Sequence, residues 1–376
     1  MTTWSSLMRA LVVGLLLTTG PAMVVATQAS CQRCRGGSDQ QPEPTPVVLA
    51  GMEAIPSDVQ VVIGADVKRL RESWLINRAI EQMFRRDPEL ATRIRELWDV
   101  CKIDPGKDLD SILIALGPGA GRDSSTTPRA DQQATDAAVA ADAGAASAAS
   151  VVMDQALMVV TGKFVEAELA ACVGERLAAD GGRLTFETVA GRTFYHATGK
   201  QDVWFTLPGP STVVVATSSS WLARAVGDGD KLTASRPMAA LLARIDRNAG
   251  AWAVGLIDEQ IGKGLVEQTA GEVAAPPRAM FVDLDPNNGL RIALGAEMSS
   301  EKDANYLVSL IKKQLAIGRW ALERYGLDRL VQKLEVNVRG STVHLALALS
   351  EGELKEALSQ IDSSKGSAQN PPKVED

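Results

Sequence analysis

The sequence predicts an α+β fold built from two related halves with mostly antiparallel sheets. Runs rich in β-branched residues alternate with segments whose apolar residues recur at helical spacing, and several strands follow one another across short turns. Both halves are expected to follow the order β-α-β-β-α-β-β, with extra strands in the first half. This repetition predicts a diverged duplication.

The first half begins with a strand at residues 59–67, because VQVVIGADV is rich in β-branched side chains, and Asp66 can cap the helix that follows. Apolar residues at helical spacing predict one face of that helix: Leu70, Trp74, Ile80, Met83 and Phe84. Further helices are predicted at 88–101, 165–179 and 219–226. Further strands are predicted at 111–116, 156–161, 184–189, 193–198, 203–207 and 212–217.

The second half is predicted to retrace this order. Its strands are expected at 252–257, 279–284, 291–297, 334–338 and 342–349. Its helices are expected at 259–270, 301–325 and 351–361. The long second helix should end before Gly326, since glycine is typical of helix ends. The turns at 189–193 and 338–342 share the pattern V-x-G-x-T, which supports a duplication.

Segments of biased composition flank and interrupt the two halves, which we assign to residues 55–230 and 231–362. Residues 1–30 are typical of an export signal, with one basic residue before a short apolar run and small residues at its end. The other segments are a Pro/Gly-rich tether at 31–54, a disordered Ala-rich insertion at 118–150 and a disordered tail at 363–376.

The export signal leaves three fates open for the N-terminus. Cleavage after Ala26 or Ala29 gives a soluble product, retention leaves an N-terminal membrane anchor, and lipidation of Cys31 gives a lipoprotein. Small residues precede Cys31, as in a bacterial lipobox, although Gln28 stands where that motif has an aliphatic residue. Each fate predicts a periplasmic or envelope-anchored protein that touches the membrane only through this end.

Composition argues against several functional classes. The net charge of −7 and the pI near 5.2 argue against a nucleic-acid partner, because nucleic acids attract clustered Lys and Arg. Aromatic residues make up 4% of the chain, which is sparse for stacking platforms or a carbohydrate-binding aromatic surface. No cofactor is predicted.

The four cysteines form two pairs along the sequence. Cys31 and Cys34 make a CxxC in a polar stretch without a preceding strand, so a tether end is a better interpretation than a redox or zinc site. Cys101 and Cys172 both lie on predicted helices. In an exported protein they are expected to form a disulfide, with two separate buried thiols as the alternative.

Candidate catalytic and metal-binding residues are few. His196 and His344 lie on separate predicted strands without a local serine or carboxylate signature, so we interpret both as structural. Ser299–Lys302 has the pattern S-x-x-K, but Ser300 followed by Asp303 is better explained as a helix N-cap. Residues 283–289 begin like a calcium loop, yet Asn-Gly between two apolar strands favours a hairpin turn.

Two segments resemble known sequences. IPSD at 55–58 leads into VQVVIGADVKRLRES, and CKIDP at 101–105 leads into DLDSILIALG. Together they resemble secreted proteins and lipoproteins of high-GC Gram-negative bacteria, in families defined by a domain of unknown function. The resemblance covers mainly residues 55–226. It implies an envelope location and pairing of Cys101 with Cys172, and it transfers no functional residue.

The sequence thus predicts a non-enzymatic exported cell-envelope protein. The leading hypothesis is a binding or scaffold module that engages another envelope protein or itself through sheet edges or helix faces. An alternative is a carrier that holds an apolar ligand, such as a lipid, between the sheets and the helix at 301–325. An enzyme of unrecognised type is a third hypothesis.

Overall fold

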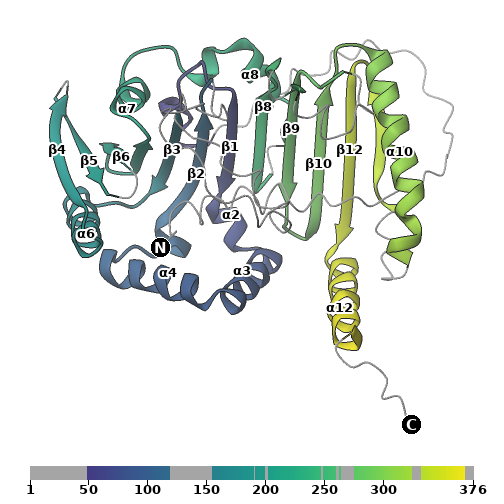
Figure 1. Ribbon diagram of the computed structural model, residues 1–376, viewed down its shortest axis with the longest axis horizontal. Coiled ribbons are helices and arrows are strands. Elements are labelled where there is room, and N and C mark those ends of the chain that lie inside the picture. The colour runs from purple at the N-terminus through teal and green to yellow at the C-terminus, as the bar shows by residue number, and fades with distance from the viewer. Residues whose placement is uncertain are drawn as a thin grey trace, which may run out of the picture.

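A single antiparallel sheet of 12 strands forms the body of the protein in a computed structural model (Figure 1). The structure describes residues 49–118, 155–189, 191–199, 202–246, 249–259, 262–263, 275–323 and 332–368. The predicted export signal, the Cys31/Cys34 pair and most of the tether, insertion and 259–270 helix lie outside the described residues.

The chain alternates strands with helices in nearly the predicted order. The strands are β1 (Val61–Asp66), β2 (Leu109–Leu116), β3 (Ala156–Gly162), β4 (Arg183–Val189), β5 (Arg192–Thr198), β6 (Val203–Gly209), β7 (Thr212–Ala216), β8 (Ala251–Leu256), β9 (Ala279–Asp285), β10 (Gly289–Glu297), β11 (Glu335–Arg339) and β12 (Thr342–Ser350). The helices are η1 (Met52–Ala54), α2 (Val67–Arg71), α3 (Trp74–Arg86), α4 (Pro88–Cys101), α5 (Pro105–Asp108), α6 (Glu166–Ala179), α7 (Ser219–Val226), η3 (Leu232–Ala234), α8 (Arg236–Leu242), α10 (Glu301–Glu323) and α12 (Glu351–Ala368). The predicted α+β class is confirmed.

The two halves meet at the centre of the sheet, where β1 pairs antiparallel with β8. From this junction outwards, the first half runs β1, β2, β3, β7, β6 and the second runs β8, β9, β10, β12, β11. This mirrored order is what a duplication produces, with the hairpin β5–β4 added at the outer end of the first half (Figure 1). By position in the sheet, β11–β12 corresponds to β6–β7. The shared V-x-G-x-T turns therefore do not occupy equivalent places, because the first of them joins β4 to β5.

Several boundaries differ from the prediction. The tether ends earlier, because Met52 and Ala54 of η1 are buried in the core. The tail begins later, because α12 continues to Ala368. The helix after β1 is divided at Ser73, whose hydroxyl accepts a hydrogen bond from the Ile76 N–H and donates one to the Pro286 carbonyl. This side chain caps α3 and ties its start to the β9–β10 turn.

One side of the sheet, here called the covered face, carries the main core. Alternate residues of the central strands point to it, and they are between 0% and 5% exposed: Val62, Leu113, Leu157, Val159, Val214, Trp252, Val254, Ala279 and Phe281. They pack against η1, α7, η3 and α8 through Met52, Trp221, Leu222, Leu232, Met238 and Leu241. Neither η3 nor α8 was predicted, although Met238, Leu241 and Leu242 follow helical spacing.

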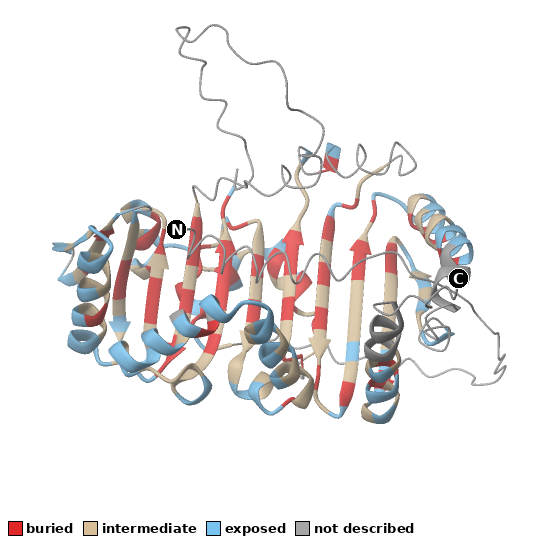
Figure 2. Ribbon diagram, turned by 60° about the horizontal axis from the view of Figure 1, so that its bottom comes forward, coloured by how far each residue is buried: buried red, intermediate tan, exposed pale blue. Residues whose placement is uncertain are grey.

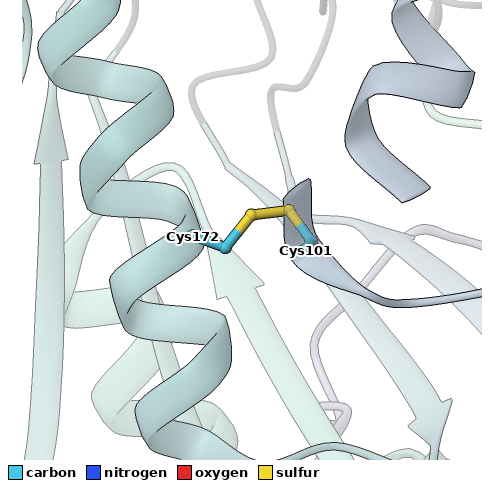
Figure 3. Close-up of a disulfide and its surroundings, with 2 residues drawn as sticks. All are labelled: Cys101 and Cys172. Atoms are coloured by element: carbon cyan, nitrogen blue, oxygen red, sulfur yellow. A yellow bond between two sulfur atoms is a disulfide. The ribbon is translucent and has the colours of Figure 1, made fainter. Parts of the chain in front are cut away.

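A disulfide joins Cys101 at the end of α4 to Cys172 in α6 (Figure 3). The two Cα atoms are 5.1 Å apart, and the residues are separated by 71 positions in the sequence. The pairing expected from an exported chain is thus present, and the alternative of two separate thiols is wrong. The bond fastens α4 to α6, which itself packs on β4 and β5.

We expect the double variant Cys101→Ala/Cys172→Ala to lose about 2–4 kcal/mol of unfolding free energy, since the bond closes a long loop and restricts the unfolded chain. Urea unfolding with and without a reductant measures this loss. Reductant should lower the midpoint of the wild type and leave that of the double variant unchanged. An unchanged wild-type midpoint would contradict the prediction.

Candidate binding face

The other side of the sheet, here called the open face, is apolar but only partly covered. One row of side chains runs directly across six neighbouring strands: Met158, Ile114, Ile63, Ala253, Val282 and Leu294. A second row runs parallel to it: Val160, Ile112, Ala65, Ala251, Leu284 and Ile292. All are of intermediate exposure except Ile114, which is buried.

The two faces of these strands differ in how far their side chains are buried, although the side chains on both faces are mostly apolar. At the centre of β1 and β8, residues on the covered face are buried (Val62, Gly64, Trp252 and Val254), whereas those in the two rows of the open face are half-exposed. An antiparallel sheet with one solvated face normally alternates apolar residues with polar ones. Here the half-exposed residues are also apolar, which is typical of a surface that meets an apolar partner.

Among the described residues, the most exposed large apolar side chains lie outside the helices of the covered face. They belong to α3, α4 and α10, to β4 and to the residue before α6: Ile80, Met83, Trp98, Val100, Tyr306, Ile317, Phe186 and Val165. No residue of α7 or α8 belongs to this set. Figure 2 shows the strands in red and tan, and much of the surrounding helical surface in pale blue.

Helices α6 and α10 flank the open face at its two ends (Figure 1). Tyr195 of β5 points to this face and donates a hydrogen bond to Glu166 of α6 over 3.0 Å. At the other end, Ala304 and Val308 of α10 are buried with Ala296 and Val343 of the sheet. These side chains fill the space below the N-terminal half of α10, so a ligand beneath this helix stays an untested prediction. The partly covered apolar surface lies between α6 and α10.

The two histidines lie far apart, on strands separated by eight others in the sheet. At about 4.8 Å per strand this separation is about 40 Å, so they cannot share a site. The His196 ring stacks on Trp204 with centroids 4.0 Å apart. His344 meets Phe281 edge-on, and burial lowers its pKa, as do Arg339 and Arg244. Their surroundings fit the structural interpretation.

The structure confirms the simpler interpretations of the other two motifs. The Ser300 hydroxyl donates to the Asp303 carboxylate and accepts from the Asp303 N–H, as in a helix N-cap. Asn288 and Gly289 both have positive φ angles and connect β9 to β10 as a hairpin turn. Asp285, the third residue of the supposed calcium loop, pairs instead with Arg291 over 3.1 Å.

A charged cluster lies on the covered face beside α8. Asp283 is 8% exposed and lies near Asp246, which pairs with Arg291 over 2.8 Å. Next to them, Arg244 pairs with Glu297 over 3.0 Å. Burial raises the pKa of Asp283 to about 6, and the Asp246 carboxylate contributes to the rise. The cluster fixes the chain after α8 to β9 and β10.

The described ranges contain neither a candidate membrane-spanning helix nor a candidate metal site. No helix there is long and apolar enough to cross a membrane. No group of three or more His, Cys, Asp or Glu side chains there is arranged to hold a metal ion.

Comparison with known proteins gives only distant structural likeness. No protein family model and no curated protein matches the sequence. Among solved structures, crystal form III of TP0453 is 12% identical with a TM-score of 0.45, and covers 83% of this chain and 98% of its own. Crystal form I of the same protein is 13% identical with a TM-score of 0.42, covering 84% and 98%. No function is inferred from this likeness.

We expect Asp283→Asn to stabilise the protein at neutral pH but not at pH 4. The folded-state pKa of Asp283 lies above that of an unfolded Asp, near 3.9. Its contribution to stability is therefore fully present below about pH 4 and is lost as the pH rises through about 6. Asparagine stays neutral, so the gain at pH 7.5 should reach about 1–3 kcal/mol. Thermal unfolding at both pH values measures it, and equal effects at the two would contradict the prediction.

Proposed function

We propose that the protein is a non-enzymatic, exported cell-envelope protein that binds an apolar ligand bearing an acyl chain on the open face. The observation that carries this proposal is the pair of half-exposed apolar rows across β3, β2, β1, β8, β9 and β10. Of the hypotheses drawn from the sequence, the geometry favours the carrier, with the ligand beside α10 rather than beneath it.

The dimensions of the open face suit a hydrocarbon chain. Six strands at about 4.8 Å spacing give a row about 24 Å long, which exceeds the thickness of one bilayer leaflet, about 15 Å. An acyl chain laid along either row would meet an apolar side chain on every strand. Each buried methylene contributes about 0.8 kcal/mol, so the contact can hold a chain without an enclosed cavity.

The chemistry of the face favours an acyl chain over a polar ligand. Both rows consist of Ala, Val, Leu, Ile and Met, with no hydrogen-bonding side chain among them. An extended peptide laid over this face would leave its own backbone N–H and C=O groups without partners, which is costly. A hydrocarbon chain has no such groups to satisfy.

Export and a periplasmic or envelope-anchored location belong to the same proposal. The signal-like residues 1–30 support it, and so does the Cys101–Cys172 disulfide, since such bonds persist in oxidising compartments. Lipidation of Cys31 stays a prediction that the intact mass of the mature protein can test.

We expect Ile63→Thr/Val282→Thr to weaken binding of a fluorescent fatty acid about tenfold. Both side chains lie at the middle of the first row, and threonine keeps the β-branched shape while it replaces apolar surface with a hydroxyl. Fluorescence titration measures the change, and native mass spectrometry shows whether a lipid co-purifies.

The matched control is Ala348→Thr, which alters an exposed residue on the opposite face of β12. It should leave the affinity unchanged. Equal affinities for the wild type and the double variant, or no binding of the probe by a folded wild type, would refute an apolar site on the open face.

A further inference from the structure

Strand β4 forms one outer edge of the sheet and pairs only with β5 among the described strands (Figure 1). Its sequence from 183 to 187 is Arg-Leu-Thr-Phe-Glu. Arg183 and Glu187 are exposed and form no ion pair with another described residue. Phe186 is 73% exposed, the most exposed large apolar side chain in the described part of the chain. This edge combines free backbone groups, unpaired charges and an uncovered aromatic ring.

The edge is complementary to itself. If two copies of β4 pair antiparallel about a two-fold axis through Thr185, each residue faces the one at the mirrored position. Arg183 then faces Glu187 of the second copy, and Leu184 faces Phe186. Opposite charges and apolar pairs directly across an antiparallel ladder are the favourable cross-strand combinations. A shift of one residue would set Arg183 against Phe186 and move the contacts to opposite faces, so the charges also specify the register.

The aromatic side chains support the same arrangement. On the open-face side, Phe205 stacks on Tyr195 with centroids 4.7 Å apart, and Tyr195 meets Phe186 at 6.4 Å. This row of rings ends at the sheet edge. Helix α6 lies over β4 and β5, yet it leaves Phe186 uncovered. In the two-fold pair, Leu184 of the second copy would continue the row and cover the exposed ring.

The opposite edge of the sheet is a poorer partner for β4. Strand β11 reads Glu-Val-Asn-Val-Arg from 335 to 339. Antiparallel pairing of the two five-residue segments would set Arg183 against Arg339 and Glu187 against Glu335. Like charges in these positions repel, which disfavours open-ended chains of molecules. The valines of β11 pack under α10, so this edge offers no exposed apolar side chain of its own.

We propose that the protein forms a two-fold symmetric dimer by antiparallel pairing of β4 with β4 of a second copy, centred on Thr185. The partner is therefore a second copy of this chain, recognised by main-chain hydrogen bonds, two Arg183–Glu187 ion pairs and two Leu184–Phe186 contacts. This proposal is independent of the ligand suggested for the open face.

Charge reversal tests the dimer. Arg183→Glu and Glu187→Arg each place like charges opposite one another at both ends of the ladder, so each should weaken dimerisation at least about tenfold. The double variant Arg183→Glu/Glu187→Arg restores opposite charges with inverted polarity and should recover the wild-type dissociation constant. Sedimentation analysis over a range of concentrations measures all four proteins.

Thr185→Cys supplies a second readout, because residue 185 faces its own copy on the two-fold axis. Under mild oxidation it should give a disulfide-linked dimer, identified as a 185–185 cross-link by peptide mapping. Asn337→Cys at the middle of β11 is the matched control and should give no 337–337 link. A wild type that stays monomeric, a dimer insensitive to the single reversals, or a double variant that is not rescued would overturn the proposal.

Discussion

The antiparallel pairing of β1 with β8 is the constraint on which the rest of the structure depends. It joins two halves of similar order into one sheet, and a single core runs across the junction on the covered face. The register sets Gly64 opposite Trp252, and any Cβ at position 64 would overlap the buried indole. A glycine is therefore required at this place, since the tryptophan of one half packs over the backbone of the other.

Because the halves share one sheet, the molecule has two large faces. Among the described helices, α7 and α8, with η1 and η3, bury the middle of the covered face. Helices α6 and α10 pack on the ends of the open face, and the disulfide holds α4 against α6. The apolar middle of the open face is left half-exposed. The main hydrophobic core therefore lies on one side of the sheet.

Most strands and helices could be predicted from the sequence, because their signals span only a few residues. Such signals are the β-branched runs of the strands, the N-cap formed by Ser300 with Asp303, and the hairpin turn at Asn288-Gly289. The joining of the halves could not be predicted, since β1 and β8 lie far apart in the chain and nothing local specifies their pairing. The continuous apolar runs in β1 (VVIGAD) and β2 (SILIAL) did contain a signal for the open face, because strands of a one-sided sheet normally alternate with polar residues.

The two proposed surfaces are geometrically related. A two-fold axis through Thr185 lies perpendicular to the sheet, so pairing at β4 would leave the open faces of both copies on the same side. A dimer would then present two apolar faces toward one surface or one large partner. Two linked sites hold such a partner more firmly than either does alone, because the second contact forms at a high effective concentration. The β4 edge would in this way increase the avidity of the open face without altering any residue of its apolar rows.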